Sequence, residues 1–362
     1  MSICDLPDDV LVLVLRRCVL QGYSSYEFKA NLPLVAVCRQ WRRLALPLAN
    51  ANLFVQYSNG DCCGRDSDGA TEPQTNLGLI AAADCAAHVR RVRFDILFIT
   101  NHARDVRSVL ELLRTVAGEW RGVRAVEIVA YLDSHHVDDH SINTAHDEQD
   151  IADVCGSLAA LMPGVQQLQF THESHNVRAQ VLAGQLASLY SAQLRALHST
   201  SHIVLPVDCW FPRLAVVNIC CSTPGARLPR LDPAQLQKLT VYNAPADHSW
   251  IGLGHSGDAA PVVFPQLYFF SLQYNAPPAA AQPAPLQFLR LRNIYVDCPG
   301  ECQILARAVL PDHMESICFL GNVAFYRSIA GAPLPAATTL DLHVDPGAGS
   351  NVGVMPYINH AL

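Results

Sequence analysis

A short hydrophobic pattern recurs along most of the chain. Apolar residues at the first, fourth and sixth positions, with polar or variable residues between them, are typical of a short strand that faces a core on one side. The clearest copy is Leu286-Gln-Phe-Leu-Arg-Leu291. The intervals between copies run from 19 to 42 residues, which predicts a repeat of unequal coils. Ten copies begin at Val89, Val123, Val165, Leu194, Leu214, Leu236, Leu267, Leu286, Met314 and Ala337.

Proline distinguishes these copies from chance matches. Three apolar positions alone would match a chain of this length about ten to fifteen times. Seven of the ten copies, however, have a proline one to three residues upstream, whereas random placement would give about two. A proline there suits a loop that enters a strand, because it cannot continue a helix. We therefore expect an α/β fold, an irregular solenoid that resembles leucine-rich repeats, with parallel strands and with helices or loops on the convex side.

Helical spacing fills the early intervals between the predicted strands. The segments 105–117, 151–161 and 181–189 each place apolar residues on one face. After Leu205 the connections are short and rich in proline, and only 303–310 keeps helical spacing. We therefore expect helices behind the first half of the sheet and irregular returns behind the second. The asparagine that leucine-rich repeats place at the bend after each strand occurs only as Asn275 and Asn322.

Two helical segments precede the repeats. Leu6-Pro-Asp-Asp-Val10 opens the first, with proline in its first turn and acids beside the positive end of the helix dipole. In the second segment Leu34, Val37, Cys38 and Trp41 recur at i, i+3, i+4 and i+7, which is one face of a helix. The spacing predicts two amphipathic helices at the N-terminus.

The order of these residues resembles the F-box, a small helical motif that docks on a Skp-type adaptor of a cullin ubiquitin ligase. The resemblance covers about the first fifty residues and rests on Leu6-Pro-x-x-Val10 followed by Val37-Cys-Arg-x-Trp-Arg-x-Leu44. The chain as a whole is similar to fungal-type F-box/leucine-rich-repeat substrate receptors. The gap between the two halves is several residues longer than in the family and contains residues 21–27. The resemblance implies adaptor contacts by Leu6, Pro7, Val10, Leu13, Leu34, Val37, Cys38 and Trp41.

Composition narrows the class of protein. At 362 residues, with 50% hydrophobic and 16% charged residues, the chain is globular and can bury a large core. Its net charge of −7 argues against nucleic acid or anionic membranes as partners. There is no run of eighteen apolar residues, and no basic start of a secretory signal. With thirteen scattered cysteines, we expect reduced thiols in a cytoplasmic or nuclear protein. We expect helical residues 1–50, a linker or first coil at 51–88, and the solenoid at 89–362.

Two segments carry residue types that bind cofactors or metals. Residues 252–257 match the dinucleotide fingerprint, but prolines rather than a helix follow, so a loop is expected. Residues 133–148 gather histidines and carboxylates suited to zinc in the longest interval between predicted strands. A metal-dependent enzyme and a solvated loop both account for that segment. We expect no cofactor, no metal and no catalytic residue.

The solenoid prediction implies a partner-binding face. Side chains between the apolar positions point away from the core, and stacked coils collect them into one concave surface. By the resemblance, this surface would recruit a protein substrate to the ligase core, and the arginines predict an acidic or phosphorylated segment in that partner. The alternative is an interaction scaffold whose N-terminal helices only cap the solenoid. The predicted face consists of Lys238, Tyr242, Phe269, Phe288, Arg290 and Arg292.

Overall fold

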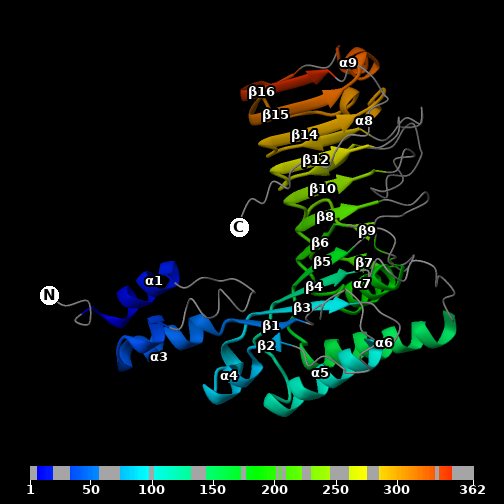
Figure 1. Cartoon of the computed structure of the whole chain (residues 1–362). Coiled ribbons are helices and arrows are strands. Elements are labelled where there is room, and N and C mark those ends of the chain that lie inside the picture. Colours follow the sequence, from blue (N-terminus) through cyan, green and yellow to red (C-terminus); the bar gives the residue numbers. More distant parts are fainter. Residues whose placement is uncertain are drawn as a thin grey trace, which may run out of the picture. The chain divides into compact units, whose positions relative to one another are not determined.

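A computed structural model shows a mixed α/β fold built around a large, open parallel sheet (Figure 1). The chain divides into two compact units, Met1–Gln235 and Leu236–Leu362. The structure describes residues 6–18, 33–56, 74–97, 102–131, 144–172, 177–200, 203, 205, 209–221, 230–244, 261–274, 285–330 and 334–344.

The strands of the first unit lie in the order β2-β1-β3-β4-β5-β6-β8. Neighbours are parallel, except that β2 runs antiparallel to β1. β7 (Trp210–Phe211) and β9 (Arg230–Leu231) form a separate parallel pair. The main strands are β1 (Asn52–Gln56), β2 (Gln74–Thr75), β3 (Arg91–Leu97), β4 (Ala125–Tyr131), β5 (Gln167–His172), β6 (Ala196–Ser199) and β8 (Val216–Cys220).

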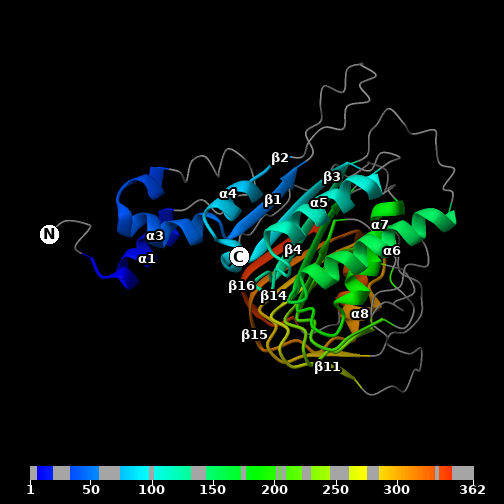
Figure 2. The ribbon, with the colours of Figure 1, turned by 90° about the horizontal axis from the view of Figure 1, so that it is seen from below.

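Helices return the chain between the strands of this unit. The three predicted segments lie within α5, α6 and α7, except that α5 ends one residue before the first segment does, and these helices pack side by side (Figure 2). Their apolar stripes are buried, as at Leu110, Val154 and Leu186, because each amphipathic helix turns one face to the core. The helical elements are α4 (Leu77–Ala82), η2 (Ala86–His88), α5 (His102–Val116), α6 (Thr144–Leu161) and α7 (Val177–Leu189).

The second unit has five parallel strands in the order β10-β12-β14-β15-β16. A second parallel pair, β11 (Val262–Phe264) and β13 (Leu286–Phe288), packs against the core side of this sheet through aromatic rings. The predicted helix at 303–310 shortens to four residues. The elements are β10 (Lys238–Tyr242), β12 (Phe269–Gln273), β14 (Asn293–Cys298), β15 (His313–Gly321), β16 (Ala336–Val344), α8 (Gln303–Ala306) and α9 (Val323–Ile329).

The hydrophobic pattern marks most strands of the large sheet. In the first seven copies the strand begins two residues after the first apolar position. The eighth copy of the pattern predicts a strand of the large sheet in the wrong register. Leu286 belongs to β13 in the small sheet, and Leu289 is 51% exposed. The copy that matches β14 starts five residues later, with Leu291, Ile294 and Val296 all buried. Overlapping leucines fit both registers, so the pattern alone could not separate them.

Arginine side chains hold the turns that lead into two strands of the first unit. We call this arrangement an arginine clasp. Arg90 Nη1 donates hydrogen bonds to the carbonyls of Ala87, Val89 and Gly122 at 2.8, 3.2 and 3.4 Å. Arg124 Nη1 repeats this one coil later, with the carbonyls of Arg121, Val123 and Gly164 at 2.8, 3.3 and 3.2 Å. The clasps satisfy main-chain carbonyls of the turns that precede the strands, not of the bends after them where asparagine is expected.

The predicted bend asparagines have different outcomes. Asn322 caps α9, since its Oδ1 accepts a hydrogen bond from the Phe325 amide at 3.0 Å. Its Nδ2 donates to the Pro299 carbonyl, which ties the helix start to the end of β14. Asn275 lies outside the described residues.

Candidate functional site

The N-terminal helices form a small hydrophobic core of their own. α1 (Asp8–Cys18) and α3 (Arg39–Ala49) enclose it, and residues 33–36 are also helical. The acids of the first turn and the arginines of the last turn of α1 complement its dipole. Cys38 caps α3, because its Sγ accepts a hydrogen bond from the Trp41 amide at 3.5 Å. The buried core residues are Leu11, Leu15, Trp41 and Ala45.

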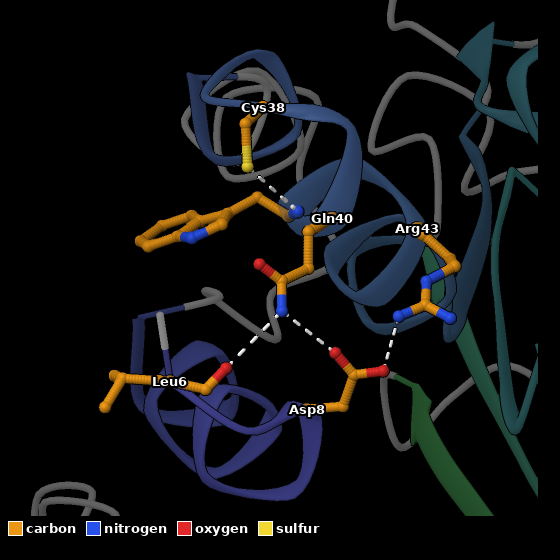
Figure 3. A network of polar contacts seen from close by, with 6 residues as sticks. Leu6, Asp8, Cys38, Gln40 and Arg43 are labelled. Carbon is orange, nitrogen blue, oxygen red and sulfur yellow. Dashed lines mark hydrogen bonds and ion pairs between the residues drawn. The ribbon is translucent and has the colours of Figure 1, made fainter. Parts of the chain in front are cut away.

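Polar contacts at the start of α1 fix the angle between the two helices (Figure 3). Gln40 Nε2 donates to Asp8 Oδ1 at 3.0 Å and to the Leu6 carbonyl at 3.4 Å. Arg43 forms an ion pair with the other Asp8 oxygen. The hydrogen bond from Gln40, followed by the contacts with Arg43, lowers the pKa of Asp8. Because these groups are solvent-exposed, the network contributes orientation more than stability.

The predicted adaptor contacts divide into surface and core residues. Val10, Leu13 and Val37 are 40%, 62% and 53% exposed. Trp41 is only 8% exposed, and its Nε1 has no hydrogen-bond partner in the described part of the chain. Pro7 is exposed, whereas Leu6, Leu34 and Cys38 are half-buried. The prediction of Trp41 as a contact residue therefore needs correction, because its ring fills the core between the helices.

The second unit has a polar face, opposite the buried side chains of its strands, that we call the outward face. Lys238 Nζ lies 4.9 Å from the centroid of the Phe269 ring, which it faces across the β10–β12 pair. Tyr242, on the same face of β10, is 39% exposed. A lysine over an aromatic ring is a cation–π contact. Three of the six residues predicted for the concave face therefore lie together on the large sheet.

The other three predicted residues lie elsewhere. Phe288 is 2% exposed and packs against Phe264 and Phe270, with ring centroids 5.4 Å apart in both pairs. It cannot contact a partner, so that prediction was wrong. Arg290 follows β13 in a bend, and Arg292 precedes β14 and donates to Glu315 Oε1 at 3.3 Å. The misplaced register of the eighth copy accounts for all three misassignments.

Carboxylates occupy part of the outward face that the sequence analysis missed. Tyr295, Cys318 and Asp341 face one another across β14, β15 and β16. Asp297 accepts a hydrogen bond from Gln273 Nε2 at 3.1 Å. Burial, and then the charge of Asp297, raise the pKa of Tyr295. These carboxylates remove the basis for expecting an acidic or phosphorylated partner segment. The correct register of β14 would have identified Tyr295 and Asp297.

The first unit has a charged row on the face of its strands that carries Arg93 and Glu127. Arg93 Nε bonds to Asp95 Oδ1 at 2.6 Å, and Nη1 bonds to Glu127 Oε1 at 3.2 Å. Gln169 and His198 continue the row of Arg93 and Glu127 across β5 and β6. Burial raises the pKa of Glu127, although the charge of Arg93 opposes that shift. Within this row, ion pairs join Arg93 to Asp95 and to Glu127.

The described residues do not form a metal-binding site. Within them, no three His, Cys, Asp or Glu side chains are arranged to hold a metal ion. The fingerprint at 252–257 and residues 133–143 of the histidine-rich segment lie outside the described part of the chain. None of the described helices is both long and apolar enough to cross a membrane. Comparison with family models, curated proteins and solved structures found no match to this chain.

Proposed function

We propose that this protein is the substrate-recognition subunit of a cullin-type ubiquitin ligase. The exposure of Val10, Leu13 and Val37 carries the proposal. Val10 and Leu13 lie on α1 and Val37 lies in the bend before α3, while the core of this helix pair is already filled by other residues. Apolar side chains left on the surface of a small helical unit favour a protein interface. The similarity of this N-terminal stretch to the F-box identifies the proposed partner as a Skp-type adaptor within the cullin ligase core.

The proposal gives the helix-pair residues two separate roles. Leu11, Leu15 and Trp41 hold the helices together, and the contacts of Asp8 set their angle. The exposed apolar side chains make the adaptor contact. Because each is only about half exposed, burying it against a partner would contribute about 1–1.5 kcal/mol.

The repeats supply the recognition surface in this proposal. Parallel strands that begin at a fixed offset from a recurring motif support an irregular leucine-rich-repeat-like solenoid. The outward face, with Lys238, Tyr242 and Phe269, is the proposed site for a protein substrate. Aromatic and cationic side chains on an ordered sheet are the types that dominate interface energetics. No step of catalysis is assigned to this chain.

The test is co-purification of the full-length chain with a Skp-type adaptor. The Leu13→Glu/Val37→Asp variant changes two exposed positions and leaves the core residues in place. Leu79→Glu is the matched control, since Leu79 lies on α4 and is 49% exposed. We expect the wild type and the control to bind, and the double variant to lose about 100-fold or more in affinity.

Thermal unfolding of all three proteins checks that the fold is intact. Adaptor binding by the double variant at wild-type strength would refute the assigned surface. No binding by the wild type would refute the ligase function, and would favour an interaction scaffold in which the helix pair is only a cap.

A further inference from the structure

The last strand of the second unit leaves part of the core side uncovered. β16 ends the sheet order and pairs only with β15 among the described residues (Figure 1). Leu340, Leu342 and Val344 are 52%, 49% and 56% exposed. Leu340 and Leu342 are in register with Ile317 and Phe319, which are fully or almost fully buried. These side chains belong to the core-facing row, and the described residues cover only about half of each.

β16 has few of the features that protect an edge strand, namely Asp341 and a hydrogen bond from Tyr326 to the His343 carbonyl. An edge exposes a row of backbone N–H and C=O groups, and proteins block it with proline, lysine, bulges or short length. β16 is nine residues long, and neither proline nor lysine lies within it. Asp341 and His343 alternate with the exposed leucines and so point to the opposite face. This edge therefore favours pairing with another strand.

The sequence of β16 is complementary to itself when two copies run antiparallel. With a two-fold axis at Leu342, that residue faces its own copy, and Leu340 faces Val344 of the second copy. The same register places Asp341 opposite His343 of the second copy. Apolar pairs and carboxylate–imidazole pairs across strands are both stabilising. One register thus matches the apolar face and the polar face together.

We propose that β16 is a homodimer interface in which two copies of this chain pair antiparallel about Leu342. The contact is isologous, because the same strand contributes both sides and the two-fold axis closes the assembly. Within β16 the overlap covers residues 340–344 of each copy, so it buries the exposed apolar row and pairs the edge of that stretch. Two outward faces would then be displayed by one assembly, which raises avidity for a substrate with repeated motifs. This inference does not depend on adaptor binding.

The first test is the mass of the full-length chain in solution, by light scattering after gel filtration over a range of concentrations. We expect a dimer for the wild type and a monomer for Leu342→Lys, since that change places two like charges at the axis. Val323→Lys is the matched control, because Val323 lies on α9 outside β16 and is 56% exposed. It should remain dimeric. A monomeric wild type, or a dimeric Leu342→Lys, would overturn the proposal.

A charge exchange tests the register itself. His343→Asp places a carboxylate opposite Asp341 of the second copy, and should raise the dimer dissociation constant about tenfold. The double change Asp341→His/His343→Asp restores opposite partners and should return the constant to the wild-type value. A purely local effect on folding would not be reversed by the second substitution. If the double variant dimerises no better than the single one, the register is wrong.

Discussion

The indole of Trp41 should decide whether the N-terminal helices stay folded. It is the largest of the four buried residues of their core, beside Leu11, Leu15 and Ala45. Replacing a buried tryptophan with alanine costs about 3–5 kcal/mol. Each of the two leucines contributes about 1.5–3 kcal/mol, so Trp41→Ala removes roughly half of the apolar stabilisation. We expect the helix pair to open while strands β3 to β5 remain folded.

Trp41→Phe should behave differently, because the buried Nε1 has no hydrogen-bond partner among the described residues. A buried donor without a partner costs about 1–3 kcal/mol. Phenylalanine keeps most of the ring and removes that donor, so the lost packing is offset. We expect the stability of the helix pair to stay within about 1 kcal/mol of the wild type.

Hydrogen exchange measured by mass spectrometry reports this local opening. Amides of residues 6–18 and 33–50 should lose protection in Trp41→Ala and keep it in Trp41→Phe. Unchanged protection in Trp41→Ala would show that the ring does not hold the core. Equal losses in both variants would show that Nε1 has a partner, and would refute the comparison.

Two further predictions follow from charged groups. Because the pKa of Asp8 is lowered, the ionised carboxylate helps to hold the helix pair above about pH 4, and this help is lost as the pH falls further. The hydrogen-exchange protection of α1 should therefore fall in acid. In Asp8→Asn that protection should not change with pH over the same range. Arg93→Met leaves Asp95 and Glu127 without their cation, and should lower the free energy of unfolding by about 2–4 kcal/mol at pH 8. Because burial raises the pKa of Glu127 in the folded state, this deficit should shrink as pH falls and the carboxyl takes up a proton. Urea unfolding at pH 8 and at lower pH measures it, and a deficit that grows in acid would contradict the assignment.

The strand positions were largely accessible from the sequence, because a side chain that must face a core leaves a periodic trace. Val92 and Phe94 in β3 are examples, since both are buried where the pattern expected them. The pattern failed near Leu286 and Leu291, where two overlapping registers contain the same residue types. Only the pairing of β13 with β11 separates them.

Side-chain roles were less accessible than strand positions. Helical spacing grouped Val37 with Trp41 on one face, although one side chain lies on the surface and the other in the core. The prediction of one helix face was wrong, because Val37 and Cys38 lie between helical residues 33–36 and α3. The clasp of Arg90 was not predicted because its partners are main-chain carbonyls, which have no residue type to recognise.

The arginine clasps also explain how coils of unequal length can share one sheet. Arg90 and Gly122 are 32 residues apart, whereas Arg124 and Gly164 are 40 apart, yet both pairs close with similar hydrogen bonds. The eight additional residues change neither the clasp nor the parallel pairing of the strands. The distance between neighbouring strands is thus independent of what the chain inserts behind them. Peptide tags or whole domains could be inserted in those returns without shifting the strand register.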